Sequence, residues 1–383
     1  MCSRNSAPRL RRHSLIRIDK RRLFHLDWYL IVNVAALIVV GLVNLISATR
    51  SFESGPYSLL VKQLVALLLG FIVILVVCSY DYRLIASYSR QFYLVGLCLI
   101  VVVLIIGSIA GGAKRWLMLG GVAFQPSELM KPLMVLFLAH MLQQKKKEGE
   151  PLGLKQLVVP LLYIVVPCVL ILKQPDLGTA VVILLTCLCM LWFVGMKWSA
   201  YGFLAGLGAV AIPIFWKYLM KPYQKMRVLS LISPDLDPSG YGYHSIQAKI
   251  AVGSGKFFGK GYLAGTQHKL HFIPEHHTDF IFTVFGEEWG FIGSVVLFLL
   301  FLSLIYRCIK ISMSTTDMLG STIAFGIASI IFIQFTVNIL MAINLAPVVG
   351  IPLPFISYGG SSLITSLICI GLLLNVNMRR YMF

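Results

Sequence analysis

The sequence predicts an all-α, polytopic integral membrane protein with about ten transmembrane helices and one long extracytoplasmic loop. Of its 383 residues, 58% are hydrophobic and only 13% are charged, whereas a soluble domain carries about 25% charged residues. The mean hydropathy is +0.84. Apolar runs of roughly 20 residues, the length that crosses a bilayer as a helix, recur from residue 28 to the C-terminus.

Ten apolar runs define the predicted helices. The first begins at Trp28, behind a basic tail, and is too long to be the apolar region of a signal peptide. Pro126, just before the fourth run, suits the first turn of a helix. A long loop of about residues 217–280 follows the seventh run. The predicted spans are residues 28–49, 59–79, 91–111, 127–143, 155–173, 178–195, 199–216, 281–306, 319–345 and 358–378.

Proline and glycine shape the links between the later spans. In K-Q-P-D-L-G-T, Pro175 and Gly178 join the fifth and sixth spans through a tight turn. The last two spans are joined by P-V-V-G-I-P-L-P-F-I-S-Y-G-G-S-S (347–362), which predicts a rigid, non-helical segment at membrane depth. Such backbone is tolerated only against protein or a cavity, so Ser357 is a candidate cavity-lining residue. We expect the long loop to be irregular, with a helical turn or two at residues 245–253.

The basic residues set the orientation. With the N-terminus inside, 19 Lys and Arg residues lie in inner segments and 6 in the short outer loops, which is the asymmetry of cytoplasmic anchoring. We therefore predict a basic cytoplasmic tail (1–27) and a single membrane domain (28–383), with both termini cytoplasmic and the long loop outside. Anchoring explains about half of the net charge of +18, and we predict no nucleic-acid partner.

The strongest candidate for a catalytic residue is Asp279, in H-T-D-F-I-F (277–282). It stands where the basic loop re-enters a long apolar run. A charged side chain at a helix centre in a membrane costs roughly 2.5–3.5 kcal/mol, and less near the surface. An ionisable residue kept at such a place is a functional candidate.

Cations on the outer side are candidates for substrate binding. Lys114 and Arg115 stand beside Trp116, either as an interfacial helix anchor or as a clamp for a phosphate or pyrophosphate. Arg227 adds positive charge in the long loop.

Several acidic residues have structural and functional interpretations. Glu128 and Lys131 lie on one helix face, as an ion pair facing the bundle interior or as the lining of a cavity that opens outward. Asp176 either caps the sixth helix or helps to shape the site. Glu287 and Glu288 are expected to pair with a distant Lys or with polar backbone.

We predict no metal site. His276 and His277 near Asp279 are adjacent histidines on a loop, which is a weak indication of zinc. The composition of the outer face instead favours a lipid with an anionic head and a group to deprotonate, such as a sugar on a pyrophosphate carrier.

Eight polar and glycine-rich motifs follow one another between residues 111 and 362. They are G-A-K-R-W, F-Q-P-S-E-L-M-K, K-Q-P-D-L-G-T, P-Y-Q-K-M-R, D-P-S-G-Y-G-Y-H-S-I-Q, G-K-G-Y-L-A-G-T-Q, P-E-H-H-T-D-F-I-F and P-L-P-F-I-S-Y-G-G-S-S. Taken in this order, the motifs resemble the SEDS family (shape, elongation, division and sporulation proteins). Within that resemblance, the spacing between G-T-Q (265–267) and P-E-H-H-T-D (274–279) favours the rod-shape branch over the division branch.

The resemblance implies a function and a partner. It implies a peptidoglycan glycosyltransferase that polymerises lipid II at the outer face of the bacterial cytoplasmic membrane during elongation and rod-shape maintenance. It implies that Asp279 matches an essential aspartate, and that Glu128 and Lys131 match a polar pair in a central cavity. It also implies a class B penicillin-binding protein as the transpeptidase partner. No cofactor is certain, although a divalent cation (Mg²⁺ or Mn²⁺) is compatible with loss of a pyrophosphate.

Three alternatives stay open at this point. A lipid II flippase would also use polytopic helices with intramembrane polar groups, but it should place cations along a path to the cytoplasm. A scaffold that only recruits a synthase would not need Asp279. A division-type polymerase would share the chemistry and differ in its cellular role.

Overall fold

The computed structural model describes residues 26–50, 56–110, 113–119, 122–146, 150–232, 241–266 and 277–380. The predicted basic tail (1–27) therefore falls almost entirely outside the described residues. The same is true of two pieces of the long loop, 233–240 and 267–276.

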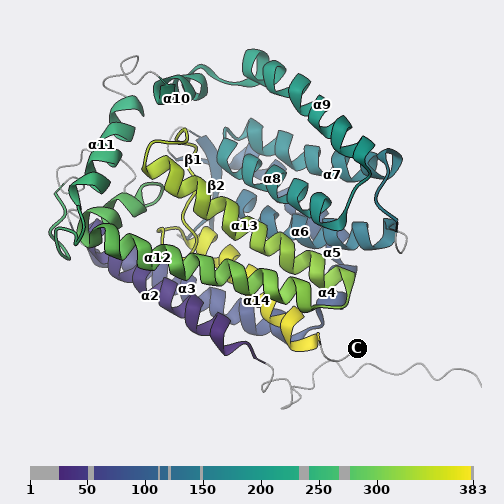
Figure 1. The fold of residues 1–383 in the computed structure, drawn as a ribbon, viewed down its shortest axis with the longest axis horizontal. Helices are drawn as coiled ribbons and strands as arrows, with labels where there is room; N and C mark the ends of the chain where they lie inside the picture. The colour runs from purple at the N-terminus through teal and green to yellow at the C-terminus, as the bar shows by residue number, and fades with distance from the viewer. Residues whose placement is uncertain are drawn as a thin grey trace, which may run out of the picture.

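The described residues form a helical bundle with one small sheet (Figure 1). Nine helices in this part of the chain are long and apolar enough to cross a membrane. They are α2 (Trp28–Thr49), α3 (Pro56–Ser79), α5 (Ser89–Ile106), α7 (Leu154–Lys173), α8 (Leu177–Val194), α9 (Trp198–Ile214) with the π-helix η1 (Phe215–Leu219), α12 (Ile281–Ser314), α13 (Met318–Ala342) and α14 (Gly360–Arg379).

The one predicted span that is absent from these nine helices is the fourth, 127–143, which forms helix α6 (Pro126–Lys145). It is long enough to cross a membrane, but it carries Glu128 and Lys131 in its first two turns and is correspondingly less apolar. Both residues are buried against neighbouring helices, so the polar groups of α6 face protein. The prediction of an all-α membrane protein is confirmed, with α6 as its least apolar long helix.

Two predicted boundaries were wrong. Helix α5 ends at Ile106 because the next residues form an antiparallel sheet of three short strands, a feature that we did not predict. Helix α12 runs eight residues beyond its predicted end at 306, to Ser314. The strands are β1 (Ser108–Ala110), β2 (Ala113–Leu119) and β3 (Val122–Phe124), in the order β1-β2-β3.

The long loop is more ordered than we expected. Its described part contains two helices, α10 (Pro222–Ile232) and α11 (Tyr241–Ser254), where we expected only a turn or two of helix. Phe280 and Val348 pack with Ala248 and Ala251 of α11 in a small apolar cluster. This packing explains why α11 is longer than its local sequence suggests.

Helices α13 and α14 form the centre of the bundle. In their most apolar 18-residue windows, 72% and 83% of the residues are buried, against 6% for the window in α9 and η1. Helix α9 accordingly runs along the edge of the molecule (Figure 1). The short helix α4 (Tyr82–Ser87) links α3 to α5.

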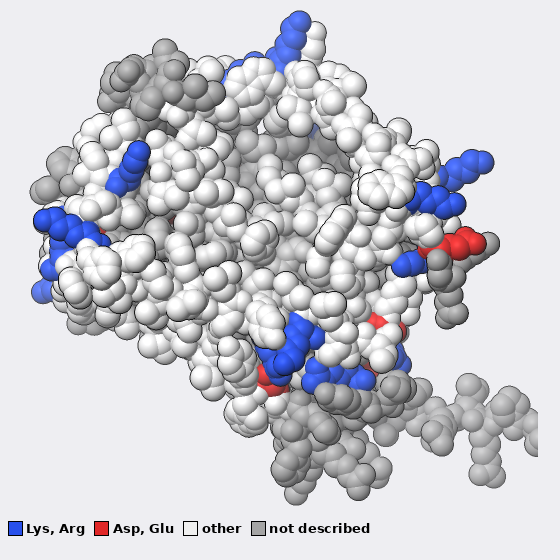
Figure 2. Space-filling model, in the orientation of Figure 1, with Lys and Arg blue, Asp and Glu red and all other residues white. Residues whose placement is uncertain are grey.

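Charged residues lie mainly at the margins of the face in Figure 2, and its broad middle is uncharged. At the start of α2, Asp27 accepts a hydrogen bond from Leu30 N (3.1 Å). The same carboxylate pairs with Arg307 near the end of α12 (2.6 Å). Because a start and an end meet there, α2 and α12 run antiparallel.

Candidate functional site

The segment between α13 and α14 enters the bundle without forming a helix. Residues 343–359 consist of turns and extended backbone. A Cβ placed on Gly41 of α2 would lie 2.4 Å from Phe355 O, so only glycine lets the two backbones approach. Gly41 lies eight residues before the end of α2, or about 12 Å along the helix axis. The predicted non-helical segment is thereby confirmed over residues 347–359, whereas residues 360–362 already belong to α14. We call residues 343–359 the re-entrant loop.

The re-entrant loop and α13 hold the backbone around Asp279. Asn338 of α13 donates from its side-chain amide to Asp279 O (2.9 Å) and to Ile351 O (2.8 Å). The Ser357 hydroxyl donates to Thr278 O (2.7 Å) and accepts from Leu353 N (2.8 Å). These contacts join two segments that lie about 60 residues or more apart along the chain.

Further bonds secure the same region. Tyr358 N donates to His277 O (3.0 Å). Gln63 of α3 donates to Ser357 O (3.3 Å) and accepts from Gly359 N (3.2 Å). Asp279 therefore stands on backbone that is fixed by hydrogen bonds on both sides of it, although it belongs to a turn.

The Asp279 carboxylate lies against bare backbone of the re-entrant loop. A Cβ on Gly350 (φ 72°) would lie 3.3 Å from Asp279 Oδ2. The positive φ favours glycine at this position, and the missing side chain leaves room beside the carboxylate. Asp279 itself is half-buried, so this acid is neither sealed in the core nor freely solvated.

A break in α12 sets the direction of the segment behind Asp279. Gly290 has non-helical angles (φ 63°, ψ −157°), and residues 256–261 supply hydrogen bonds that the helix lacks there. Gly259 is required at this crossing, because its Cβ would lie 2.1 Å from Glu288 O. The bonds run from Lys260 N to Glu287 O (3.0 Å), Gly261 N to Glu288 O (3.0 Å), Phe291 N to Lys256 O (2.9 Å) and Ile292 N to Phe257 O (3.2 Å).

At the break, the part of α12 that precedes Gly290 turns back along α2. Over most of its length α12 runs antiparallel to α2, and Glu288 meets Ser47 through a hydrogen bond. Asn44, deeper in α2, nevertheless donates to Ile281 O (3.1 Å), so the order reverses beyond Gly290. Ile281 therefore lies near the level of Asn44, about 8 Å before the C-terminal end of α2 along its axis. Asp279 is two residues away.

Both acidic residues after Asp279 have structural partners, of which only that of Glu287 is the distant Lys we expected. Glu287 is buried and pairs with Lys260 (2.6 Å), and it also accepts from Thr266 N (2.8 Å). Glu288 accepts from the Ser47 hydroxyl. Both residues bind the broken part of α12 to its neighbours.

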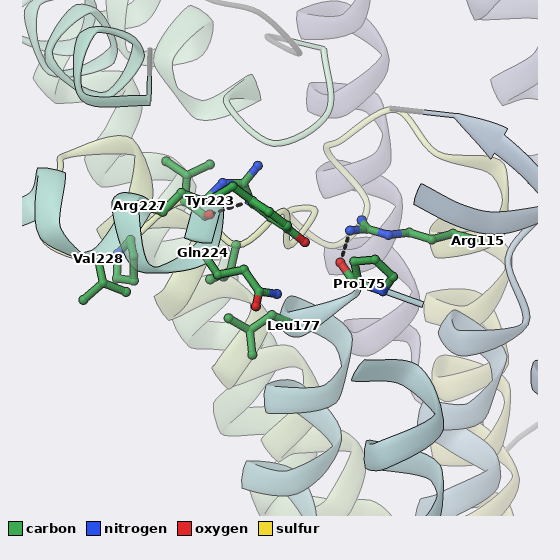
Figure 3. A pocket seen from close by; sticks show the side chains of 10 residues that line it. Arg115, Pro175, Leu177, Tyr223, Gln224, Arg227 and Val228 are labelled. Carbon is green, nitrogen blue, oxygen red and sulfur yellow. Dashed lines mark hydrogen bonds between the residues drawn. The ribbon is translucent and has the colours of Figure 1, made fainter. Parts of the chain in front are cut away.

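Two of the predicted cations meet in one pocket (Figure 3). Arg115 reaches in from β2, and Arg227 and Tyr223 come from α10 on the opposite side. The pocket is completed by Pro175 and Leu177 of the α7–α8 turn, by Gln224 and Val228, and by Pro347, Val348 and Val349 of the re-entrant loop.

Backbone carbonyls orient both guanidinium groups. Arg115 donates from Nε to Gln174 O (3.3 Å) and from Nη2 to Pro175 O. Arg227 donates from Nη1 to Val348 O (3.0 Å). A guanidinium carries five N–H donors, and three of those of Arg115 make no hydrogen bond to a described residue. These remaining N–H groups are the kind of donors that bind the oxygens of an anion.

The pocket and Asp279 flank the same stretch of the re-entrant loop. Arg227 binds Val348 O, and the Asp279 carboxylate lies against Gly350. Two residues of backbone extend at most about 7 Å. The structure thus brings Asp279, Arg115, Arg227 and Ser357 to one end of the bundle.

The remaining predicted residues lie outside this pocket. Lys114 is exposed and precedes Arg115 on a strand, so its side chain points to the other face. Glu128 and Lys131 form a buried ion pair (2.7 Å, side chains 5% and 2% exposed). Asp176 is also buried and accepts from Thr179 N (3.2 Å), which confirms it as the cap of α8, and from Ser127 Oγ (3.1 Å).

Sequence reasoning missed three amides that position the site, namely Asn338, Gln63 and Asn44. Each is a buried polar residue within an apolar helix. An uncharged polar residue in an apolar run was the only feature of the sequence that could have indicated its role. Among the described residues, no group of three or more His, Cys, Asp and Glu side chains is arranged to hold a metal ion.

Fold and site together define a polytopic helical membrane protein with a half-buried carboxylate and a dibasic pocket at one end of the bundle. The cell cycle protein family model that unites FtsW, RodA and SpoVE matches residues 23–382. The chain belongs to this family, the SEDS family, as its motifs indicated.

The relatives cover nearly the whole chain. Peptidoglycan glycosyltransferase MrdB of Escherichia coli is 37% identical over 94% of this chain and 95% of its own length. A probable peptidoglycan glycosyltransferase FtsW of Trichlorobacter lovleyi is 38% identical over 93% and 94%. Both branches of the family are thus similarly close in sequence.

Solved structures share the fold. The rod shape determining protein RodA of Thermus thermophilus has a TM-score of 0.69 at 30% identity, covering 93% of this chain and 98% of its own. A chain from a study of polymerization and crosslinking by a peptidoglycan synthase complex has a TM-score of 0.78 at 33% identity, covering 94% and 99%.

Proposed function

We propose that this chain polymerises lipid II, a disaccharide-peptide on undecaprenyl pyrophosphate, into glycan strands, with Asp279 as the catalytic base. Peptidoglycan glycosyltransferase activity follows from the family and from relatives that carry this name. The role of Asp279 is supported by one observation above all. Its backbone is held by Asn338 while its carboxylate is left beside the bare backbone of Gly350.

Asp279 accepts the proton of the 4-hydroxyl of the acceptor sugar as that oxygen attacks C1 of the donor sugar. The bond from C1 to the lipid pyrophosphate breaks, and the configuration at C1 inverts. Because both substrates are anchored in the same membrane plane, proximity supplies much of the rate acceleration.

Arg115 and Arg227 bind the pyrophosphate as negative charge develops on it. Two guanidinium groups already oriented by carbonyl oxygens need little rearrangement to do so, which is the condition for effective electrostatic stabilisation. Lys114, on the other face of β2, contributes long-range attraction for the anionic head. A divalent cation would add charge neutralisation to the same leaving group.

The buried residues act through position. Glu128 and Lys131 keep α6 in register beneath the site, and Asp176 fixes the α7–α8 turn that carries the carbonyl partners of Arg115. Ser357 holds Thr278 and the re-entrant loop together. In this proposal these residues do not contact the substrate themselves but position the groups that do.

The proposed setting is the bacterial cytoplasmic membrane, with both termini cytoplasmic and Asp279 on the outer side, as the distribution of Lys and Arg supports. We further propose the rod-shape branch and a class B penicillin-binding protein as partner. The similarity to a chain of a peptidoglycan synthase complex supports the partner.

The experiment that tests this function is reconstitution. The purified chain, alone and with its transpeptidase partner, is incubated with lipid II, and the products are separated by glycan chain length. Polymers longer than one disaccharide are expected. Transport of fluorescent lipid II across vesicles without polymer formation would support a flippase instead.

The branch is tested separately by complementation. Expression in a bacterium depleted of its rod-shape SEDS protein is expected to restore rod-shaped cells. Restoration of division in a strain depleted of its division-type protein, with no effect on rod shape, would reverse that assignment.

A further inference from the structure

A second cavity lies on the membrane-facing side of the bundle, away from the site described above. It is a groove between α2 and α3 with α14 as its floor, and it encloses about 1810 Å³ of empty space including its open side. Its lining is almost entirely apolar. The lining residues are Leu26, Trp28, Ile31, Val34, Ala35, Ile38, Leu67, Phe71, Ile74, Leu75, Cys78, Ser79, Leu367, Ile370, Leu374 and Met378.

The groove is closed at its outer end by the re-entrant loop. One turn beyond Ile38, Gly41 of α2 lies against the backbone of Phe355 and Ile356. On the α3 side, Gln63 is hydrogen-bonded to Ser357 O and Gly359 N. The loop therefore fills the space between α2 and α3 above the groove.

The length of the groove matches one leaflet of a bilayer. Its lining on α3 runs from Leu67 to Ser79, which is about 18 Å at 1.5 Å per residue. Half of the hydrocarbon core is about 15 Å, whereas a transmembrane helix needs the full 30 Å or so. A groove of one leaflet's length that is closed at mid-membrane fits hydrocarbon chains better than a partner helix.

Arginine side chains gather at the open, inner end. Arg307 near the end of α12 is partly exposed (22%) and pairs with Asp27 beside the groove. Arg83 is more exposed (37%) and lies 3.9 Å from Asp317. Arg379 and Arg380 follow the lining residue Met378 at the end of α14, and Arg379 lies 3.7 Å from Asp81. Four arginines therefore stand beside three aspartates here. Basic residues next to a membrane attract anionic lipids by about 1 kcal/mol each.

We propose that this groove is a binding site for an anionic phospholipid of the inner leaflet, whose acyl chains lie between α2 and α3 and whose head meets the basic inner end. The assignment to the inner leaflet rests on the orientation given under the proposed function. The lipid is distinct from the substrate, because the groove ends below the re-entrant loop and Asp279 lies beyond it.

The bound lipid supports the catalytic region from below. Helix α2 carries Gly41, Asn44 and Ser47, which contact the re-entrant loop, Ile281 and Glu288. Acyl chains that fill the groove keep α2 at its distance from α3, and thereby keep these contacts in register. Loss of the lipid should lower thermal stability and, with it, the fraction of chains that hold Asp279 in place.

The first test uses the unmodified full-length protein. It is reconstituted in nanodiscs of phosphatidylcholine with a trace of phosphatidylglycerol that carries a photoactivatable diazirine at the end of an acyl chain. After irradiation, the labelled peptides are mapped by mass spectrometry. Labelling concentrated in residues 28–38, 67–79 and 367–378 is expected. Labelling spread evenly over the lipid-facing helices would mean annular lipid only and would overturn the proposal.

The second test fills the groove. Ala35→Trp places a large side chain in it, whereas Val32→Trp adds the same side chain to an exposed position on α2 outside it. By native mass spectrometry, Ala35→Trp should retain phosphatidylglycerol about fivefold less than wild type, or about 1 kcal/mol, and Val32→Trp should retain it normally. Equal retention by all three proteins, or recovery of an isoprenoid lipid in place of phosphatidylglycerol, would contradict the assignment.

Discussion

Replacing Asn338 by leucine should displace Asp279 while leaving the fold in place. The Asn338 amide makes two hydrogen bonds, to Asp279 O and to Ile351 O, and thereby joins α13 to both sides of the site. Leucine has a similar volume and removes both donors. Interhelical hydrogen bonds in membrane proteins contribute about 0.6 kcal/mol each, and a carbonyl left unpaired in the interior costs about 1–3 kcal/mol.

These contributions sum to about 2 kcal/mol or more in favour of the observed position of Asp279, a factor of about 30 in the equilibrium between placed and displaced backbone. The rate of lipid II polymerisation by the purified Asn338→Leu protein with its partner should therefore fall by about that factor. Binding of lipid II should change little, because the pocket around Arg115 and Arg227 is untouched.

The matched control is Gln334→Leu, one turn earlier on α13. Gln334 is buried, and its side-chain nitrogen has no partner within the described part of the chain. This variant should keep its rate and its unfolding temperature. If Asn338→Leu polymerised lipid II within about twofold of wild type, the claim that this amide positions the base would be refuted.

Three further variants test the rest of the site. Gly290→Ala should destabilise the protein by about 2 kcal/mol or more, because a Cβ there lies 2.2 Å from Gly259 N at a positive φ; Gly253→Ala, which meets open space, should be neutral or stabilising in the same thermal unfolding assay. Glu128→Gln should cost about 3–5 kcal/mol by leaving Lys131 buried without a counter-charge. Adding Lys131→Met should recover most of that loss, and no recovery would show that the pair has another role. Arg115→Gln should weaken binding of an undecaprenyl pyrophosphate analogue at least about tenfold, measured by calorimetry, and unchanged affinity would remove this residue from the anion pocket.

The sequence predicted the helices well and the interruptions poorly. The ends of a long apolar run are visible in the sequence, so α2 begins and ends where its run does. The short strands before α6 could not be foreseen, because three to seven residues of alternating character resemble any loop. The break at Gly290 was also missed. A glycine in an apolar run is common, and only the approach of Gly259 from a distant loop makes it a break.

The charged residues of the site were predicted from the sequence, but the uncharged residues that hold them in position were missed. Asp279, Arg115 and Arg227 were chosen because a charge near a membrane needs a reason to be there. The amides that support the site carry no charge. Asn338, Gln63 and Asn44 matter because each donates a hydrogen bond to a backbone carbonyl of a residue distant in the chain. Ser357 was chosen as a lining group, whereas its hydroxyl holds backbone on both sides. Which carbonyl an amide meets depends on tertiary packing, which local sequence does not encode.

The central claim is that the Asp279 carboxylate removes the proton from the acceptor sugar. The most direct measurement is single-turnover polymerisation of lipid II by the purified Asp279→Asn protein with its partner, beside Asp317→Asn, a helix-capping aspartate at the start of α13. We predict that Asp279→Asn binds lipid II and its partner normally and forms no polymer, while Asp317→Asn stays active. Polymer formation by Asp279→Asn at the wild-type rate would contradict the account.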